Sequence, residues 1–526
     1  MTARARPPES APTNPVEAPP QGTGVPPATP STRHPAAPIA ILGVPFDKIS
    51  TSESLSLIEQ MIASGRPHYA ATANVDFVVQ ASHDVELRRI LGDADLVLCD
   101  GMPLLWASRL LGNPLPERVA GSDLVPLLLA DAELKGWRIF FLGGSEDSLA
   151  RAAENVRARH PRLQLVGAYS PPFKPLLEMD HADIVRRVRD ARPDILLVAF
   201  GCPKQEKWIS MQFRNTGVPL SIGVGATIDF LAGSVRRAPV WMQRTGLEWV
   251  FRLLQEPRRL FRRYVTDFWV FGRAILRQAW QLRTTRPCRQ TQPPSQAPSQ
   301  PNASDNNDNA HFEELSLDGC FDAATARQHS VLWTRLTAGR KHVLLNLSGL
   351  KFIDSTGVGM LVRLQKNLTA AGRQLVLVAP ALCVTRALNL MRLNEFIPAA
   401  DSLDAARDLI RRRLTEESVV TTDTTDTVTT AGPNTQHLAW QGDIVAANAE
   451  DVWRMTQPHI ANPGGIQSVL NIDLSAVRFI DSTGVSLMVR VRKEAQKNGV
   501  QARFSQPRPA VLNVLRMLRM ETHLLG

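Results

Sequence analysis

The stretch "WRIFFLGGSEDSLARAAENVRARHPRLQLVGAY", residues 137–169, contains the pattern that decides the fold class of the N-terminal half. An apolar run at 137–144 ends in two glycines, an amphipathic segment follows at 145–160, and a second apolar run begins at 163. Apolar runs of this length are typical of strands buried on both faces, and the segment between them has helical periodicity. The stretch therefore predicts a strand–helix–strand unit of a parallel sheet.

The same alternation continues on both sides of that stretch. The apolar runs end in Gly, Asp, Asn or Thr, and helical patterns such as 182–191 lie between them. This alternation predicts an α/β fold with a mostly parallel sheet that helices cover on both faces. Polar residues at the strand C-termini then matter most, because ligands of open α/β sheets bind there. The other predicted strands are 68–79, 94–101, 194–201 and 219–227.

The chain has 526 residues, of which 44% are hydrophobic, and a formal net charge of +10. Its length indicates about three domains, and its charge favours an anionic partner, either a membrane surface or nucleic acid. The five cysteines include no CxxC pair, which argues against a disulfide framework or a zinc site and for a reducing cytosol. No signal peptide is expected, and no apolar run approaches the roughly 18–20 residues of a spanning helix. We therefore expect any membrane contact to be peripheral.

Three stretches with little capacity to pack divide the chain, and we expect them to be disordered. They are a proline-rich leader at 1–37, a linker at 284–310 and a second linker at 415–436. They leave an α/β domain, a basic helical appendage and two smaller α/β domains, at 38–251, 252–283, 311–414 and 437–526.

Polar residues collect where the predicted strands of the first domain end. Asp100 could act as a general base there, although a carboxylate at a strand end also suits a helix cap or a turn. Gly143 and Gly144 precede Ser145 at the start of a helix, where backbone N–H groups can bind phosphate. A tight strand-to-helix turn is the other explanation of these glycines, and the sequence leaves both open.

Several stretches of the first domain and its appendage follow one another along the chain: "TAN" (72–74), "DG" (100–101), "PERVAGSD" (116–123), "FLGG" (141–144), "GCPKQE" (201–206), "GATIDFLAG" (225–233) and the segment 236–264. The order of these motifs resembles the WecG/TagA/CpsF family of glycosyltransferases. The resemblance implies an inverting, metal-independent enzyme that moves an N-acetylmannosamine-type sugar from a UDP-sugar to a lipid-diphosphate-linked acceptor. It also implies a role in bacterial exopolysaccharide or cell-surface polysaccharide synthesis, in the cytoplasm at the face of the inner membrane.

The resemblance assigns roles to residues by their motif positions. It makes Asp100 the base that deprotonates the acceptor hydroxyl, with Thr72 and Asn74 in the sugar pocket. Arg118 matches an arginine suited to the diphosphate, because a guanidinium binds such a group bidentately. The candidates for the nucleotide-sugar side are Gly143, Gly144, Gln205 and Glu206, and Asp229 and Arg237 complete the substrate-binding set.

The segment 252–286 has nine arginines and two acids, so it carries +7 of the net charge. Apolar and aromatic residues recur in it near helical spacing, which is typical of a basic helix at a membrane surface. The alternatives are a helix packed on the enzyme with solvated arginines, or nucleic acid, which the lack of a binding motif disfavours. The resemblance favours the membrane and implies that Arg258, Arg259, Arg262 and Arg263 face the lipid diphosphate.

The heptapeptide "FIDSTGV" occurs at 352–358 and again at 479–485. It lacks the GxSxG pattern of a hydrolase, so neither serine is expected to be a nucleophile. A strand precedes each copy and a helix follows, which makes Ser or Thr a suitable N-cap. The surrounding domains resemble STAS domains of the anti-sigma-factor-antagonist type. That resemblance implies phosphorylation by a partner kinase at Ser355 and Ser482, and binding to a protein partner or to another copy of the chain.

Two other functions stay open at this point. The chain could be a STAS-based signalling scaffold whose transferase domain is inactive, although the intact motifs argue against it. It could also use UDP-glucose or a uronate donor in the same fold, since one pocket substitution can change the preferred donor.

Overall fold

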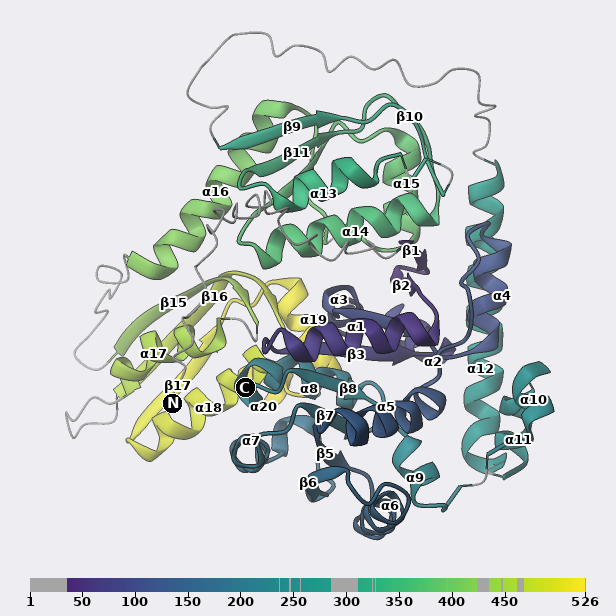
Figure 1. The fold of residues 1–526 in the computed structure, drawn as a ribbon. Helices are drawn as coiled ribbons and strands as arrows, with labels where there is room; N and C mark the ends of the chain where they lie inside the picture. Colours follow the sequence, from purple (N-terminus) through teal and green to yellow (C-terminus); the bar gives the residue numbers. More distant parts are fainter. Residues whose placement is uncertain are drawn as a thin grey trace, which may run out of the picture. The chain divides into compact units, whose positions relative to one another are not determined.

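A computed structural model describes eleven segments of the chain between residues 36 and 525 (Figure 1). We call residues 36–284 the N-terminal domain, 311–422 the first repeat and 435–525 the second repeat. The leader at 1–35, the linker from 285 to 310, residues 423–434 and the side chain of Arg259 lie outside the description. The described segments are 36–235, 237–245, 247–255, 257–284, 311–323, 325–326, 328–394, 396–422, 435–445, 448–460 and 468–525.

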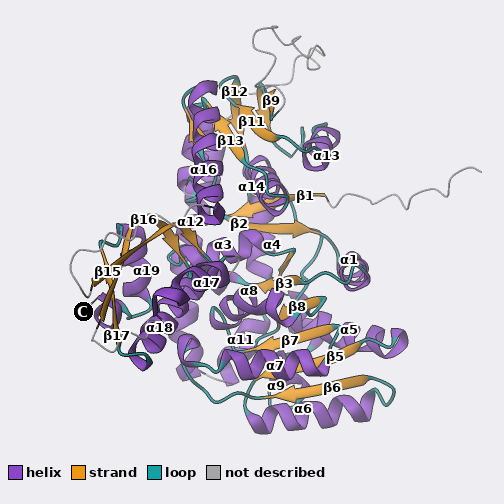
Figure 2. Cartoon of the chain, turned by 90° about the vertical axis from the view of Figure 1, so that its left-hand side faces the viewer, coloured by secondary structure: helices purple, strands orange, loops and turns teal. Residues whose placement is uncertain are grey.

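A six-stranded parallel sheet forms the centre of the N-terminal domain. Its strand order is β4-β3-β8-β7-β5-β6, and all neighbours are parallel. Helices cover both faces of this sheet in Figure 2, which confirms the predicted fold class. The strands are β3 (His68–Ala73), β4 (Leu96–Cys99), β5 (Arg138–Gly143), β6 (Gln164–Tyr169), β7 (Ile195–Ala199) and β8 (Leu220–Gly223), and an antiparallel hairpin of β1 (Ala36–Ile41) and β2 (Val44–Lys48) precedes them.

Alternate residues of each strand belong to two separate apolar cores. Phe140 and Leu142 of β5 pack in one core with Trp208, whereas Ile139 and Phe141 pack in the other. Double burial of this kind explains why the strands are continuous apolar runs. The helices are α1 (Thr51–Ala63), α2 (Val75–Ala81), α3 (Val85–Asp93), α4 (Met102–Leu110), α5 (Gly121–Lys135), α6 (Glu146–Arg159), η1 (Leu176–Glu178), α7 (His181–Ala191), α8 (Lys204–Thr216), α9 (Thr227–Leu231), α10 (Val240–Thr245), α11 (Glu248–Gln255) and α12 (Pro257–Thr284).

The strand predicted at 68–79 is only half as long as expected. Strand β3 ends at Ala73, and the Asn74 side chain accepts a hydrogen bond from the Phe77 N–H at 3.3 Å as the N-cap of α2. The prediction was wrong for the second half because a short apolar run fits a buried helix as well as a strand. Asn74 therefore lies at the turn between a strand and a helix.

Both repeats have parallel strands, and the STG of each heptapeptide begins a long helix. The single strand expected before the first heptapeptide is two strands, β11 (His342–Asn346) and β12 (Leu350–Ile353), because the chain turns between them. In the first repeat the strands are β9 (Phe312–Ser316), β10 (Gly319–Phe321), β11 (His342–Asn346), β12 (Leu350–Ile353), β13 (Leu375–Val378) and β14 (Ala399–Ala400), with helices α13 (Ser330–Ala338), α14 (Ser355–Ala370), α15 (Leu382–Leu390) and α16 (Leu403–Thr422). In the second they are β15 (Thr435–Ile444), β16 (Ser468–Ile480) and β17 (Val500–Ser505), with α17 (Ala449–Ile460), α18 (Ser482–Lys497), α19 (Pro509–Met517) and α20 (Glu521–Leu525).

One expectation about the linkers needs correction. Helix α16 continues to Thr422, into the stretch predicted to be disordered from 415, because no Gly or Pro interrupts it before Gly432. Cys99, Cys202 and Cys383 are free thiols.

Candidate active site

Three predicted residues meet at the carboxyl ends of β3 and β4. Asp100 directly follows β4, and its N–H donates to the Ala73 carbonyl of β3 at 2.9 Å. A Cβ on Gly101 would lie 4.0 Å from Cβ of Asn74, so the loops after the two strands are in contact. Thr72 Oγ1 donates to the Gly223 carbonyl at the end of β8, at 3.1 Å. Thr72, Asn74 and Asp100 thus lie at the sheet edge where ligands of parallel α/β proteins bind.

The environment of Asp100 suits a general base. Burial raises the pKa of Asp100 to about 6; the charges of Arg252 and Arg118 oppose this, while that of Glu248 raises it further. The Gly121 N–H, at the start of α5, hydrogen-bonds the same carboxylate. A carboxyl with a pKa near the working pH combines a large ionised fraction with useful basicity.

Arg118 is the centre of an ion-pair network beside Asp100. Its Nη1 donates to Glu248 at 2.6 Å and its Nη2 to Asp123 at 2.6 Å. Arg237 also contacts Asp123, at 2.5 Å, and Arg252 lies 3.5 Å from Glu248. The network therefore joins the loop between α4 and α5 to helix α11.

Three members of this network, Asp123, Glu248 and Arg252, were not predicted from the sequence. Asp123 lies inside the quoted "PERVAGSD" motif, and Glu248 and Arg252 have the i, i+4 spacing of a helical ion pair within 236–264. Those two features were the only signals in the sequence, because the pairing with Arg118 bridges 130 residues of chain.

The two predicted glycines after β5 form a tight strand-to-helix turn. Gly143 and Gly144 have φ values of +97° and +82°, and the Gly144 N–H donates to the Ala199 carbonyl at 3.0 Å. A Cβ on Gly143 would lie 2.9 Å from that same carbonyl oxygen. The turn alone therefore requires both glycines. Ser145 caps α6 by accepting a hydrogen bond from the Ser148 N–H at 3.1 Å.

Gln205 and Glu206 are buried at the start of α8, between the ends of β7 and β8. Gln205 Oε1 accepts hydrogen bonds from the N–H groups of Gly201 and Gly225, both at 3.1 Å. Its Nε2 donates to Glu206 Oε1 at 2.7 Å. The Gln205 amide thus holds two strand-end loops together. Burial raises the pKa of Glu206 to about 7, which makes it a second carboxyl of near-neutral pKa at this edge.

The remaining substrate candidates differ in their surroundings. Arg237 belongs to the network through Asp123, as described, and its guanidinium also contacts Ser122. Asp229 lies half-buried in α9, where its carbonyl accepts from the Ser234 N–H at 3.0 Å. The network includes Arg237, while no contact described for Asp229 joins it to Asp100.

Helix α12 contains all four predicted arginines, and three of their side chains are described. Arg263 lies 3.3 Å from Asp76 of α2 and 3.8 Å from Asp267, so it pairs with the domain close to Asn74. Burial and the charge of Asp76 raise the pKa of Asp267 to about 6, against the charge of Arg263. Arg258, Arg262 and Arg263 are all exposed, and Arg263 keeps 44% of its side chain open to solvent despite these pairings.

Helix α12 has one buried and one exposed apolar side. Phe271, Ile275 and Ala279 pack in the core of the N-terminal domain and form the buried side. None of the helices in the described segments is long and apolar enough to cross a membrane. The exposed apolar residues of α12 are Phe261, Val265, Phe268, Trp269, Leu276 and Trp280, all more than 40% exposed.

The aspartate of each heptapeptide is the N-cap of the helix that follows, whereas Ser or Thr was predicted as the cap. Asp354 accepts hydrogen bonds from the N–H groups of Thr356 and Gly357, at 2.7 and 2.9 Å. Asp481 does the same in the second repeat. One carboxylate oxygen can accept two N–H donors at a helix start, which leaves the serine hydroxyl for other contacts. Both serines are buried.

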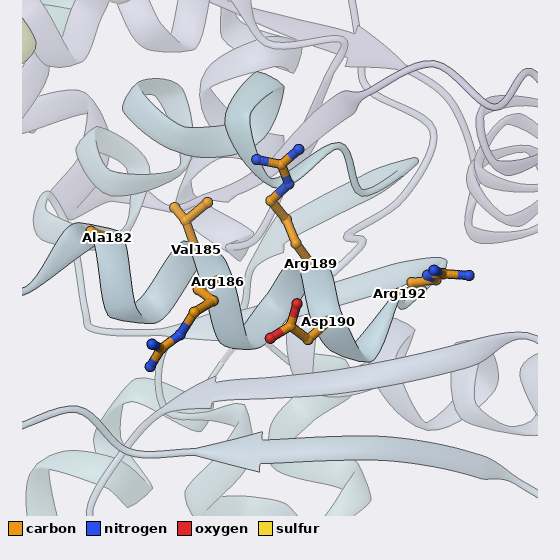
Figure 3. A pocket seen from close by; sticks show the side chains of 6 residues that line it. All are labelled: Ala182, Val185, Arg186, Arg189, Asp190 and Arg192. Atoms are coloured by element: carbon orange, nitrogen blue, oxygen red, sulfur yellow. The ribbon is translucent and has the colours of Figure 1, made fainter.

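A cavity of about 540 Å³ lies on α7, away from this site (Figure 3). Its lining includes Arg186, Arg189 and Arg192, whose side chains leave the helix in different directions. No predicted site residue lines it. The cavity is therefore separate from the candidate active site.

Comparison with known proteins agrees with both halves of the chain. A family model for the glycosyl transferase WecG/TagA/CpsF family matches residues 39–285, and one for the STAS domain matches 308–406 and 428–524. An N-acetylglucosaminyldiphosphoundecaprenol N-acetyl-β-D-mannosaminyltransferase of Bacillus spizizenii is 32% identical over 36% of this chain and 72% of its own. The enzyme of the same name from Staphylococcus aureus is 26% identical over 43% of this chain and 88% of its own.

Among solved structures, the unphosphorylated anti-sigma factor antagonist SpoIIAA is 20% identical, with a TM-score of 0.17, over 20% of this chain and 90% of its own. The two family models together account for most of the described residues. The protein therefore belongs to the WecG/TagA/CpsF family of glycosyltransferases and carries two STAS domains after its transferase domain.

Proposed function

We propose that this glycosyltransferase moves an N-acetylmannosamine-type sugar from a UDP-sugar to an acceptor sugar on a lipid diphosphate, as a step in cell-surface polysaccharide synthesis. The names of the two relatives, both mannosaminyltransferases acting on N-acetylglucosaminyldiphosphoundecaprenol, support this substrate class. The observation that carries the proposal is Asp100, a half-buried carboxyl with a pKa of about 6 at the sheet edge, next to two arginines.

In the proposed reaction, the acceptor hydroxyl oxygen forms a bond to the anomeric carbon of the donor sugar. The bond from that carbon to the diphosphate breaks, and its electron pair leaves on the diphosphate oxygen. Asp100 takes the hydroxyl proton, and attack opposite the leaving group inverts the anomeric configuration. The guanidinium groups of Arg118 and Arg252 would stabilise the charge on the leaving group.

Substrate binding would have to rearrange the network around Arg118. Both of its terminal nitrogens already donate to carboxylates, Glu248 and Asp123. A diphosphate would take the place of one of these carboxylates, since its anionic oxygens also accept charge-assisted hydrogen bonds from a guanidinium. We assign Gly143, Gly144, Gln205 and Glu206 to the nucleotide-sugar side because they lie at the ends of the neighbouring strands β5, β7 and β8.

Sugar transfer from a panel of UDP-sugars to a synthetic N-acetylglucosaminyl-diphosphate lipid tests the proposal. We expect one donor to be used, and Asp100→Asn to lose at least about a hundredfold in rate, because it removes the base. Asp190→Asn, which changes an exposed carboxylate on α7, is the matched control and should retain activity. Transfer by the wild type that survives Asp100→Asn would remove Asp100 from the mechanism. No transfer from any donor would favour a scaffold.

We also propose that α12 binds the membrane from the cytoplasmic side, so that the enzyme reaches its lipid-linked acceptor. The exposed apolar residues of α12 and its exposed arginines Arg258 and Arg262 support a peripheral location. Each arginine near an anionic leaflet contributes about 1 kcal/mol. Arg263 would fix the helix to the domain through Asp76, beside the sugar pocket.

Co-sedimentation with anionic vesicles tests the membrane proposal. The double variant Phe268→Ser and Trp269→Ser should bind vesicles several-fold more weakly than the wild type, since it removes the two most exposed aromatic side chains of α12. Leu134→Ser, which changes an equally exposed apolar residue on α5, is the control and should bind normally. Equal binding of all three proteins would contradict a role of α12.

For the repeats, we propose that they regulate the enzyme or bind a protein partner, with Ser355 and Ser482 as phosphorylation sites. Both hydroxyls are buried, so a kinase would reach them only after the repeat has moved. Mass spectrometry of the protein purified from its host, with Ser355→Ala and Ser482→Ala as references, would find the phosphate. Its absence under all growth conditions would contradict this assignment.

A further inference from the structure

The described residues from Ala36 onward belong to one compact unit, and the second repeat contacts the transferase domain through its heptapeptide serine. Ser482 Oγ donates a 2.7 Å hydrogen bond to Glu86 Oε2 of helix α3. The Ser482 N–H, at the start of α18, donates to Glu86 Oε1, also at 2.7 Å. Both residues are buried, at 0% and 5% exposure. One carboxylate of the transferase domain thus occupies the helix start where an anion is most favourable.

Glu86 connects this contact to the candidate active site. Its Oε2 lies 2.8 Å from Nζ of Lys207, which also pairs with Asp84 at 2.8 Å. Burial opposes the charge of Lys207, but Glu86 and Asp84 raise the pKa of Lys207 above its ordinary value. Lys207 is the residue after Glu206 on α8, so two contacts and one peptide bond lead from Ser482 to Glu206 at the strand-end loops.

Helix α3 offers a second contact to the same repeat. The Arg89 guanidinium lies 5.1 Å from the centre of the Phe479 ring, within the heptapeptide, and 3.7 Å from Asp443. Asp443 also pairs with Arg478 at 3.4 Å. Helix α3 therefore places the negative Glu86 against Ser482 and the positive Arg89 against Phe479 and Asp443. These groups complement the second repeat on both sides of Asp481.

The equivalent serine of the first repeat has a neutral partner. Ser355 Oγ accepts a 3.1 Å hydrogen bond from Gln278 of α12, whose amide also contacts Ala40 and Leu42. The same heptapeptide thus meets an amide donor in one repeat and a carboxylate in the other. Only the second contact would be reversed from attraction to repulsion by a negative charge on the serine.

We propose that the second repeat is an intramolecular partner of the transferase domain whose docking is controlled by the charge at Ser482. With a neutral hydroxyl, Ser482 closes on Glu86. A negative charge at this position faces the Glu86 carboxylate at hydrogen-bond distance and releases the second repeat from α3. The ion pair between Glu86 and Lys207 then changes, next to Glu206 on the nucleotide-sugar side. The effect on sugar transfer rests on the proposed function; the docking does not.

Hydrogen exchange of the full-length protein tests the docking without any substrate. Ser482→Asp should increase the exchange rate of amides in 85–93 and 482–497 by about tenfold or more, because hydrogen bonds to a charged group are lost. Ser482→Asn has nearly the same side-chain volume without the charge and should increase it much less. Adding Glu86→Gln to Ser482→Asp removes the repulsion and should restore most of the protection. Thermal unfolding of each variant checks that it is folded.

Two results would overturn the proposal. If Ser482→Asp leaves exchange in 85–93 unchanged, the second repeat is not docked there in solution. If Ser482→Asn has the same effect as Ser482→Asp, or if Glu86→Gln does not restore protection, size and not charge decides the contact.

Sugar transfer by the same proteins separates this inference from the proposed function. A several-fold difference between Ser482→Asp and Ser482→Asn in the donor KM or in kcat supports the coupling to the active site, and equal kinetics contradict it. If the wild type transfers no sugar, the proposed function fails, while the exchange measurements still decide the docking.

Discussion

Arg118 Nη1 donates a 2.6 Å hydrogen bond to Glu248 Oε2, which joins the loop between α4 and α5 to helix α11, 130 residues later in the chain. The Glu248 side chain is only 11% exposed, so the pair is shielded from water. This contact places the charges of Glu248 and Arg252 beside Asp100, where both affect its pKa. The segment after the parallel sheet is therefore part of the electrostatic environment of the candidate base.

The pH dependence of sugar transfer should report the ionisation of Asp100. The base acts when it is deprotonated, and its pKa is about 6. We expect kcat/KM to fall about tenfold for each pH unit below that value and to be level above it until another group titrates. Initial rates between pH 4.5 and 8.5 at low donor concentration give this profile. A rate that is flat through pH 6 would contradict a base with this pKa.

Glu248→Gln should move that profile to lower pH. The charge of Glu248 raises the pKa of Asp100, so its removal lowers that pKa and shifts the acid limb toward lower pH. The rate on the level part should also fall, by roughly tenfold or more, because Arg118 loses the partner that positions it. Glu133→Gln is the control. It removes a carboxylate on α5 that pairs with His160, the C-cap of α6. An acid limb that stays in place in Glu248→Gln would separate Glu248 from Asp100.

Much of the sheet could be predicted from the sequence, because strands buried on both faces must be apolar throughout. No other element fits the apolar runs around Phe141 and Leu197 over their whole length, and both runs are central strands of the sheet. The run after Ala73 shows the limit, since "VDFVV" fits a buried helix equally well and the Asn74 cap decides between the two. Local pattern determined the elements wherever a single periodicity was present.

The candidate site was predicted only in part, because half of it depends on tertiary contacts. Asp100 and Asn74 follow strands, so their position at the sheet edge comes from the α/β pattern. Glu248 and Asp123 become partners of Arg118 only after the chain has returned to the sheet, and no local pattern marks that contact. The aspartate caps of the repeats were missed for a related reason, since Ser, Thr and Asp are all good N-caps and only the geometry distinguishes them.

Glu206→Gln should change stability in a pH-dependent direction. The folded protein holds the Glu206 proton with a pKa of about 7, above the ordinary value of 4.5, so it binds that proton more tightly than the unfolded chain. The contribution of Glu206 to stability is therefore greatest below pH 4.5 and falls as the pH rises to 7. We expect Glu206→Gln to match the wild type near pH 5 and to be more stable at pH 8, by about 2–3 kcal/mol at most. Thermal melts of both proteins at pH 5 and pH 8 measure this difference; a variant less stable at pH 8 would show that the charged form is well solvated.

The glycine of each heptapeptide is required by a close backbone contact. A Cβ on Gly357 would lie 2.4 Å from the Phe321 carbonyl oxygen, and one on Gly484 would lie 2.7 Å from that of Ile444. Because a backbone atom cannot move aside easily, Gly357→Ala and Gly484→Ala should each destabilise their repeat by about 1–3 kcal/mol.

Gly272 of α12 is the matched control for these two glycines, since no atom lies within 4 Å of its Cβ position and its φ is helical. Gly272→Ala should therefore stabilise the helix, by about 0.5–1 kcal/mol. Denaturant unfolding followed by tryptophan fluorescence and by proteolysis of the repeats compares the three variants. Tolerance of alanine at Gly357 and Gly484 would mean that the starts of α14 and α18 can move away from β10 and β15. The shared STG would then need another explanation than packing.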